Sequence, residues 1–137
     1  MRALVRNAKA RLRICERGVI LDVVRVLVVD DYRSIANALC RHLRVLGHEA
    51  RAVYSGKEAL VEANAFAPHL VLLDLVLPDM TGYEVANELR LRSTAPLYIA
   101  AISTRREDLD ANIDEHAQKP FGLDRLAQIL INAGAAS

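Results

Sequence analysis

Tryptophan is absent from this 137-residue chain, and only 4% of its residues are aromatic. A surface that stacks successive nucleic-acid bases needs aromatic side chains, so the composition disfavours a single-strand-binding module. Cysteine is scarce too, because Cys15 and Cys40 are the only two and their spacing fits neither a zinc site nor a disulfide framework. We therefore expect a reducing compartment, the cytoplasm being the simplest.

Long hydrophobic runs are also lacking. No apolar stretch approaches the roughly 18 residues that a membrane-spanning helix requires. The basic N-terminus has no long apolar core and no obvious cleavage site, so it does not read as a secretion signal. What the chain does have is 53% hydrophobic and 26% charged residues, a balance typical of one globular domain.

Charge divides the chain at about residue 24. Residues 1–24 carry six Lys or Arg and two acids, a net charge of +4, whereas residues 25–137 carry twelve and fifteen, a net charge of −3. We interpret residues 1–24 as a basic N-terminal extension or linker and residues 25–137 as the domain. Because the domain is mildly acidic, we expect no nucleic-acid partner.

The extension has a helical pattern, with apolar residues three or four positions apart: Leu4, Ala8, Leu12, Cys15 and Val19. A basic amphipathic helix can dock on a partner or on an anionic membrane surface. We favour the plainer interpretation, an extension or the end of a linker helix from a longer chain, over membrane contact.

Past the extension, apolar runs alternate with helical patterns. The runs predict strands at residues 26–29, 49–53, 70–73, 97–102 and 115–118. The periodic segments, with Ser55 and Glu58 as a capping box and Gly47 as a C-cap, predict helices at about residues 34–46, 55–65, 83–92 and 123–133. This alternation predicts an α/β fold with a doubly wound, five-stranded parallel sheet.

Polar side chains follow four of the predicted strands. Asp30 and Asp31 come after the first, Asp74 after the third and Ser103 after the fourth, while Lys119 follows the last. Because the carboxyl ends of parallel strands share one edge of the sheet, we expect these groups to meet in one cleft.

Three carboxylates in one cleft need a counter-charge, and Mg²⁺ with oxygen ligands is the usual one. An aspartate can also attack phosphorus to form an aspartyl-phosphate, whose oxygens a metal, an ammonium and a hydroxyl can neutralise. No glycine-rich phosphate loop follows the first strand, so nucleotide-binding versions of the fold fit poorly.

These motifs resemble the receiver domain of two-component response regulators. The resemblance rests on VLVVDD at 26–31, LLDLVLPDMTGYEVANELR at 72–90, the hydroxyl of Ser103 and KPF at 119–121. It extends from about residue 25 to residue 131 and implies a flavodoxin-like fold. Each motif alone has a bland interpretation, such as a helix cap or a solvated loop residue, whereas the set together is specific.

The resemblance implies a role for each acid. Asp74 corresponds to the phosphoacceptor. Asp30 and Asp31 correspond to the acidic pair that holds Mg²⁺ together with Asp74, and the backbone carbonyl of Val76 is expected as a further ligand.

The resemblance assigns the remaining residues to phosphate binding and switching. Lys119, Ser103 and the backbone of Thr104 would contact the phosphoryl group, and Ser103 and His116 occupy the switch positions. The Lys119–Pro120 peptide bond is expected to be cis, which the intrinsic preference of X–Pro bonds makes accessible.

One stretch departs from the family pattern. The chain advances only sixteen positions from Ser103 to Lys119, fewer than the family does, which predicts a shortened fourth helix of one or two turns between Arg105 and Asn112. The face that reports phosphorylation in the family would then be altered. The uncovered sheet edge would invite a partner or a homodimer.

We therefore expect a phosphorelay receiver, phosphorylated on Asp74 by a histidine kinase or phosphotransfer protein and acting on a downstream protein. It would catalyse only its own phosphoryl transfer and a slow dephosphorylation, because Val76 and Arg105 near the cleft offer no general base. The alternatives are an interaction module that works without phosphorylation and a small Mg²⁺-dependent phosphatase. The receiver could stand alone or belong to a hybrid histidine kinase.

Overall fold

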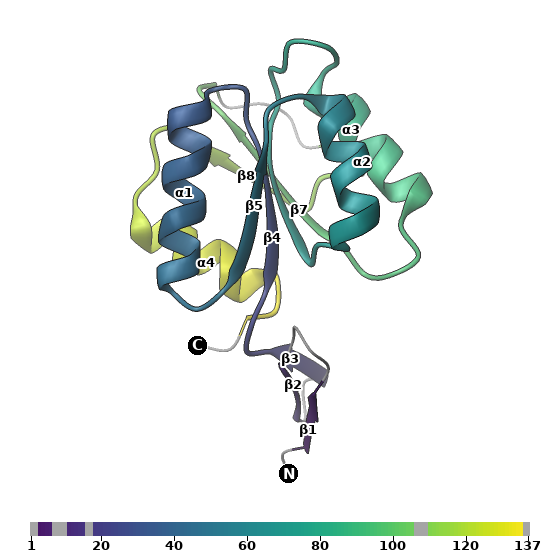
Figure 1. Cartoon of the computed structure of the whole chain (residues 1–137), viewed down its shortest axis with the longest axis vertical. Helices are drawn as coiled ribbons and strands as arrows, with labels where there is room; N and C mark the ends of the chain where they lie inside the picture. Colours follow the sequence, from purple (N-terminus) through teal and green to yellow (C-terminus); the bar gives the residue numbers. More distant parts are fainter. Residues whose placement is uncertain (1–2, 7–10, 16–17, 106–109, 136–137) are drawn as a thin grey trace.

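The computed structural model describes residues 3–6, 11–15, 18–105 and 110–135. Its main body is a five-stranded parallel sheet, whose strands are β4 (Arg25–Val29), β5 (Glu49–Val53), β6 (Leu70–Asp74), β7 (Tyr98–Ser103) and β8 (Glu115–Gln118). The helices are α1 (Arg33–Val45), α2 (Gly56–Phe66), α3 (Gly82–Arg92) and α4 (Leu123–Asn132). Helices α1 and α4 cover one face of the sheet, and α2 and α3 cover the other (Figure 1).

The strand order is β5-β4-β6-β7-β8, which is the doubly wound arrangement that the sequence predicts. The five predicted strands and the four predicted longer helices are confirmed, with ends that agree or differ by one residue. The register places Val29 opposite Leu73 and Asp74 opposite Ile102, so the carboxyl ends of the central strands lie level with one another.

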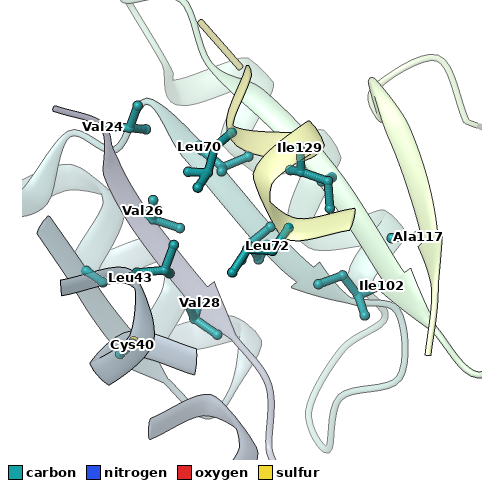
Figure 2. Packing of buried hydrophobic residues seen from close by; sticks show 14 of the residues in the cluster. Val24, Val26, Val28, Cys40, Leu43, Leu70, Leu72, Ile102, Ala117 and Ile129 are labelled. Atoms are coloured by element: carbon teal, nitrogen blue, oxygen red, sulfur yellow. The ribbon is translucent and has the colours of Figure 1, made fainter. Parts of the chain in front are cut away.

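The core has two layers because the central strands are buried on both faces. In β4, Val26 and Val28 pack beneath α1 and α4, whereas Leu27 and Val29 pack beneath α2 and α3. Figure 2 shows the first layer, in which Val26, Val28 and Leu43 of α1 lie close together. Full burial of each such side chain contributes about 1.5–3 kcal/mol, which explains why the strand sequences are almost continuously apolar.

Helix ends follow the predicted signals with one difference. Gly47, past the end of α1, has a φ of 95° and donates its N–H to the carbonyl of Arg44, as a C-cap glycine does. At α2, the hydroxyl of Ser55 accepts the N–H of Glu58 at 3.1 Å. The carboxylate of Glu58 instead accepts the N–H of Tyr54 at 2.8 Å, so the predicted capping box is shifted by one residue on that side.

The predicted helix in the N-terminal extension is wrong. The described residues there form an antiparallel sheet of β1 (Ala3–Arg6), β2 (Arg11–Cys15) and β3 (Gly18–Leu21), in that order. Arg11 to Cys15 alternate between polar and apolar residues, which is the two-residue period of a strand. This small sheet lies beyond the amino ends of the main strands (Figure 1). Ala8, one member of the predicted stripe, lies outside the described residues.

The predicted short helix between Arg105 and Asn112 falls largely on residues 106–109, which lie outside the described residues. The described flanks, 104–105 and 110–114, form bends and turns. The carboxylate of Asp110 accepts the N–H of Asn112 at 2.8 Å and closes one of these turns.

Of the helices in the described residues, none combines the length and apolar character that crossing a bilayer requires.

Candidate functional site

Four strand ends place the candidate site at the carboxyl edge of the main sheet. Asp30 follows β4, Asp74 ends β6, Ser103 ends β7 and Lys119 follows β8. Each neighbouring pair of these strands is in parallel register up to these residues. The structure thus brings residues from Asp30 to Lys119 to one edge because buried parallel strands end there.

Asp30, Asp31 and Asp74 form a group of three acids. Each offers one carboxylate oxygen, and these oxygens all lie within 4.8 Å of one another. Asp30 is only 6% exposed, and its Oδ1 accepts the N–H of Tyr32 at 2.9 Å, whereas Asp31 is exposed. Three hard oxygen donors, one of them on the exposed Asp31, suit a divalent cation such as Mg²⁺.

Lys119 supplies the positive charge of this group. Its Nζ lies 2.7 Å from Oδ2 of Asp30 and 3.2 Å from Oδ2 of Asp74. Burial alone would lower the pKa of Lys119, but the hydrogen bond to Asp30 and the charges of both acids outweigh it and raise that pKa above its ordinary value. Lys119 therefore remains an ammonium between two carboxylates.

Asp74 lies in a less favourable place for a charge. Burial is the main cause that raises its pKa above the ordinary value, and the negative charge of Asp30 adds to it. The N–H of Val76, 3.0 Å from Oδ1, and the ammonium of Lys119 act in the opposite direction without reversing the shift. The carboxylate of Asp74 is thus partly desolvated and held by fixed donors on both oxygens.

The backbone after Asp74 is packed against Gly82 at the start of α3. A Cβ on Gly82 would lie 2.6 Å from the carbonyl oxygen of Asp74 and 2.7 Å from Cα of Leu75. The N–H of Gly82 donates to the carbonyl of Leu75 at 3.0 Å. No side chain fits at this position without moving the backbone that carries Asp74.

Asp79 has a supporting role that the sequence did not reveal. Its carboxylate accepts the N–H groups of Gly56 at 2.8 Å and Lys57 at 2.9 Å, which ties the loop after Asp74 to the N-terminus of α2. These two hydrogen bonds lower the pKa of Asp79. More than twenty positions separate the partners along the chain, so no local signal could have identified the contact.

Ser103 is 5% exposed, and its hydroxyl is already engaged. It donates to the carbonyl oxygen of Arg105 and lies 2.8 Å from Nε2 of His116. The carbonyl of Ser103 accepts the N–H of Lys119 at 2.7 Å. Sequence reasoning placed Ser103 and His116 at switch positions but did not find their direct contact.

Two further predicted positions can be placed. Thr104 is exposed, and its carbonyl accepts a hydrogen bond from the side chain of Gln118 at 3.3 Å. The peptide bond between Lys119 and Pro120 is cis.

A groove of about 470 Å³ lies beside the acids, between α1 and α4. Asp30, Asp74 and Lys119 line one end of it. The rest is mainly apolar and includes Ile35, Leu39, Phe121, Leu123 and Leu126. The charged site therefore opens beside an apolar surface formed by two helices.

The sequence pattern of the family described as the response regulator receiver domain matches residues 26–131. The transcriptional regulatory protein KdpE of Mycobacterium tuberculosis is 41% identical over 103 residues, covering 72% of this chain and 46% of KdpE. The chain thus spans about half the length of the curated relatives it matches.

Two solved structures are similar to this one. The response regulator TrrA of Thermotoga maritima, in complex with Mg²⁺-BeF, has a TM-score of 0.72 and 32% identity, covering 80% of this chain and 98% of that chain. A chain from the complex of the histidine kinase ThkA with TrrA has a TM-score of 0.71 and 30% identity, covering 80% of this chain and 97% of that chain.

Proposed function

Because this chain belongs to the response regulator receiver domain family, we propose that Asp74 accepts a phosphoryl group from a histidine kinase or phosphotransfer protein in a Mg²⁺-dependent step. Receiver domains of response regulators are not classical enzymes, so the chemistry would be confined to the domain's own phosphoryl group. The observation that carries the proposal is a group of three acids whose carboxylate oxygens lie within 4.8 Å of one another. Lys119 forms salt bridges with two of these acids, Asp30 and Asp74.

The acids would hold the metal. Asp30, Asp31 and Asp74 supply carboxylate oxygens, and the carbonyl of Val76 is expected to complete the protein ligands. Bound Mg²⁺ would offset the repulsion among the carboxylates and neutralise oxygens of the transferred phosphoryl group.

Asp74 would be the nucleophile. A bond forms between a carboxylate oxygen of Asp74 and phosphorus, while the bond from phosphorus to the donor histidine nitrogen breaks. The ammonium of Lys119, 3.2 Å from Asp74, is placed to contact a phosphoryl oxygen. The hydroxyl of Ser103 and the backbone of Thr104, at the end of the neighbouring strand, would provide further contacts.

The groove between α1 and α4 supports a helical phosphodonor. Ile35 and Leu123, which line this groove, are exposed large hydrophobic residues, and so is Tyr32, two residues after Asp30. An amphipathic helix can lay its apolar side chains into such a groove. A helix seated there would bring the donor histidine close to Asp74, which lines one end of the groove.

We propose that the phosphorylated form persists. Val76, two residues after Asp74, is apolar and 75% exposed, and Arg105, two residues after Ser103, is a cation. Neither side chain can act as a general base toward an attacking water. A phosphoryl label that decays within seconds would contradict this.

The downstream partner would be a protein, or a second copy of the chain, on the β8 side. Strand β8 is at one edge of the main sheet, beside the short connection from β7. The cytoplasm remains the proposed compartment, which fits the free, buried thiol of Cys40. Membership in a hybrid histidine kinase and a stand-alone role are both compatible with this proposal.

The test is phosphorylation of the purified chain with acetyl phosphate and Mg²⁺, measured by mass spectrometry. We expect a gain of one phosphoryl group in the natural chain, no gain in Asp74→Asn, and no gain without Mg²⁺. Asp124→Asn is the matched control, because Asp124 is an exposed acid at the start of α4 outside the acidic group. It should be phosphorylated normally.

Other outcomes would replace the proposal. If neither the natural chain nor Asp74→Asn reacts, an interaction module that works without phosphorylation is the better description. Continuous turnover of a generic phosphate ester would indicate a phosphatase.

A further inference from the structure

Strand β5 forms the edge of the main sheet opposite β8, and among the described strands it pairs with β4 alone. The N–H of Glu49 and the carbonyl of Val53 both form hydrogen bonds on the β4 side. In a parallel sheet, residues that bond to one neighbour alternate with residues whose backbone groups face the other way. Ala50 and Ala52 therefore turn their backbone groups toward the open edge.

One side chain already reaches this edge. Nη2 of Arg44, an exposed residue of α1, donates to the carbonyl of Ala50 at 2.7 Å. This hydrogen bond agrees with the outward direction of that carbonyl. A charged side chain over an edge strand protects it from indiscriminate pairing with other chains. The open edge is thus covered at Ala50 by a flexible side chain that can move.

A groove of about 520 Å³ lies at the same edge. Helix α1 is on one side of β5 and α2 is on the other (Figure 1). Ala52 and Val53 line the groove from β5, Arg41 and Arg44 line it from α1, and Glu62 lines it from α2. The groove therefore combines a strand edge with side chains from both flanking helices.

The α1 side of this groove is basic. Helix α1 contains three arginines, Arg41 and Arg44 among them, and no acid, although residues 25–137 as a whole have more acids than cations. On the α2 side, Arg51 forms a salt bridge with Glu62, so its charge is already balanced. Positive charge that a ligand can neutralise is therefore concentrated on the α1 side.

We propose that this edge binds an extended, acidic segment of a partner protein, which adds to the sheet beside β5. Ala50 and Ala52 turn outward backbone groups that are about 7 Å apart, the two-residue repeat of a strand, and an extended chain can pair with both. Side chains of the added strand alternate between the two faces of the sheet. Those on the α1 face are acidic, and those on the α2 face are uncharged.

Arg44 makes the edge selective for acidic strands. A guanidinium binds a carboxylate more strongly than a neutral carbonyl, because both partners are charged and the contact can be bidentate. An acidic side chain of the added strand therefore draws Arg44 away from Ala50. The carbonyl of Ala50 then accepts an N–H of the added strand. A neutral or basic strand leaves Arg44 in place and the edge covered.

Synthetic peptides test the proposal with the full chain. The first peptide alternates glutamate with threonine, the second has lysine in place of each glutamate, and the third is the first peptide N-methylated along its backbone. We expect only the first to bind in isothermal titration calorimetry and to slow hydrogen exchange of the Ala52 N–H. No binding by the first peptide, or equal binding by either of the others, overturns the proposal.

A pair of matched arginine variants tests the role of Arg44. We expect Arg44→Gln to bind the first peptide about tenfold more weakly, the effect of one hydrogen bond between charged groups. Arg92→Gln is the control, since Arg92 is an exposed arginine of α3 paired with Glu88, and it should bind within about twofold of the natural chain. If Arg44 only protects the edge, Arg44→Gln binds equally or more tightly, which overturns the proposal.

Ala52→Pro tests the strand edge directly. Because the N–H of Ala52 faces outward, proline removes no hydrogen bond to β4, but the peptide loses a donor. Urea denaturation should show a folded variant, and peptide binding should be lost. Unchanged peptide binding contradicts the proposal. If the natural chain dimerises, this variant is monomeric and neither binds peptide, the occupant is a second copy and the proposal fails. Should the variant not fold, the N-methylated peptide decides.

The proposal does not rest on phosphorylation. Asp30, Asp31 and Asp74 are not among the described residues that line this groove. Asp74→Asn should therefore bind the first peptide as tightly as the natural chain does, while it gains no phosphoryl group. Loss of peptide binding in this variant contradicts the separation of the two sites. Each proposal can thus fail while the other stands.

Discussion

The amino and carboxyl ends of the main strands both contain polar side chains that are at least partly buried, but the partners of these side chains differ. At the amino edge, Nδ1 of His48 accepts the N–H of Val24 at 3.0 Å, and Nδ1 of His69 accepts the N–H of Arg25 at 2.9 Å. The guanidinium of Arg25 donates to backbone carbonyls, that of Ala67 among them. These side chains therefore form hydrogen bonds with backbone groups.

At the carboxyl edge, ionisable side chains face one another instead. Asp30 and Asp74 share the ammonium of Lys119, and Asp31 stands exposed beside them. Burial acts at both edges, but it lowers the pKa of His69 to about 4 and keeps that ring a neutral acceptor. It raises the pKa of Asp74, whose carboxylate lies next to other charged groups.

The larger cavity does not lie at the edge that holds the acids. A cavity of about 600 Å³ lies at the amino edge, lined by Arg25, His69 and Tyr98 among others, and it is larger than the groove of about 470 Å³ beside the acids. What distinguishes the two edges is the kind of partner that these polar side chains have. Groups paired with the backbone support the fold, whereas groups paired with each other can bind a metal or a phosphoryl group.

The largest expected effect comes from filling the space behind Asp74. Gly82→Ala should lower the free energy of unfolding by about 3 kcal/mol, because its Cβ would meet the backbone of Asp74 and Leu75. It should also weaken beryllofluoride binding. Gly122→Ala is the control, since a Cβ there meets nothing within 4 Å. Because Gly122 is the N-cap of α4, where alanine is less favourable than glycine, this variant should lose at most about 1 kcal/mol. Similar urea midpoints for the two variants would contradict this account of the carboxyl edge.

At the amino edge, His69→Phe should separate stability from function. The N–H of Arg25 loses its acceptor, so the free energy of unfolding should fall by about 2 kcal/mol, while phosphorylation by acetyl phosphate stays unchanged. A large loss of phosphorylation in the folded variant would remove the distinction between the two edges.

The same variant should change the pH dependence of stability. The pKa of His69 is about 4 in the folded protein and 6.5 ordinarily, so the unfolded chain binds the proton more readily between these values. The contribution of His69 to stability is therefore complete above pH 6.5 and is lost as the pH falls toward 4. Urea denaturation across this range should be less pH-dependent in His69→Phe than in the natural chain.

The smallest expected changes in stability come from replacing two aspartates, Asp74 and Asp79, whose pKa values shift in opposite directions. Asp74 has a raised pKa, so its ionisation destabilises the fold as the pH rises through that pKa. Asp74→Asn should therefore raise the free energy of unfolding at neutral pH in the absence of Mg²⁺, as measured by urea denaturation.

Asp79 should behave in the opposite way. Its pKa is lowered, so its stabilising effect is present at neutral pH and is lost as the pH falls through that pKa. Asp79→Asn should lower stability at neutral pH and reduce its acid sensitivity. The same direction of change in both aspartate variants would refute the assignment of the two environments.

The main sheet and the convergence of the acids could be predicted because both follow from local sequence. Burial on both faces makes each central strand apolar, and the polar residue directly after it must lie at the carboxyl edge. The extension was different, because spacings of three and four coexist there with the alternation of Arg11 to Cys15. Strand pairing, which a single segment does not encode, decides between them.

The contacts that sequence reasoning missed depend on register and on long-range packing. Asp79 meets the N-terminus of α2 only because α2 and α3 lie side by side. His116 meets Ser103 because β8 pairs with β7 in one particular register. A shift of one residue would turn His116 to the other face of the sheet.

The small sheet of β1, β2 and β3 joins β4 through residues 22–24 at the amino edge, away from the acids (Figure 1). This placement makes the small sheet a suitable site for attaching a label. An affinity tag or a fluorophore carried on the small sheet would face away from an incoming phosphodonor, so the protein could be immobilised on a sensor chip with the carboxyl edge open to solution.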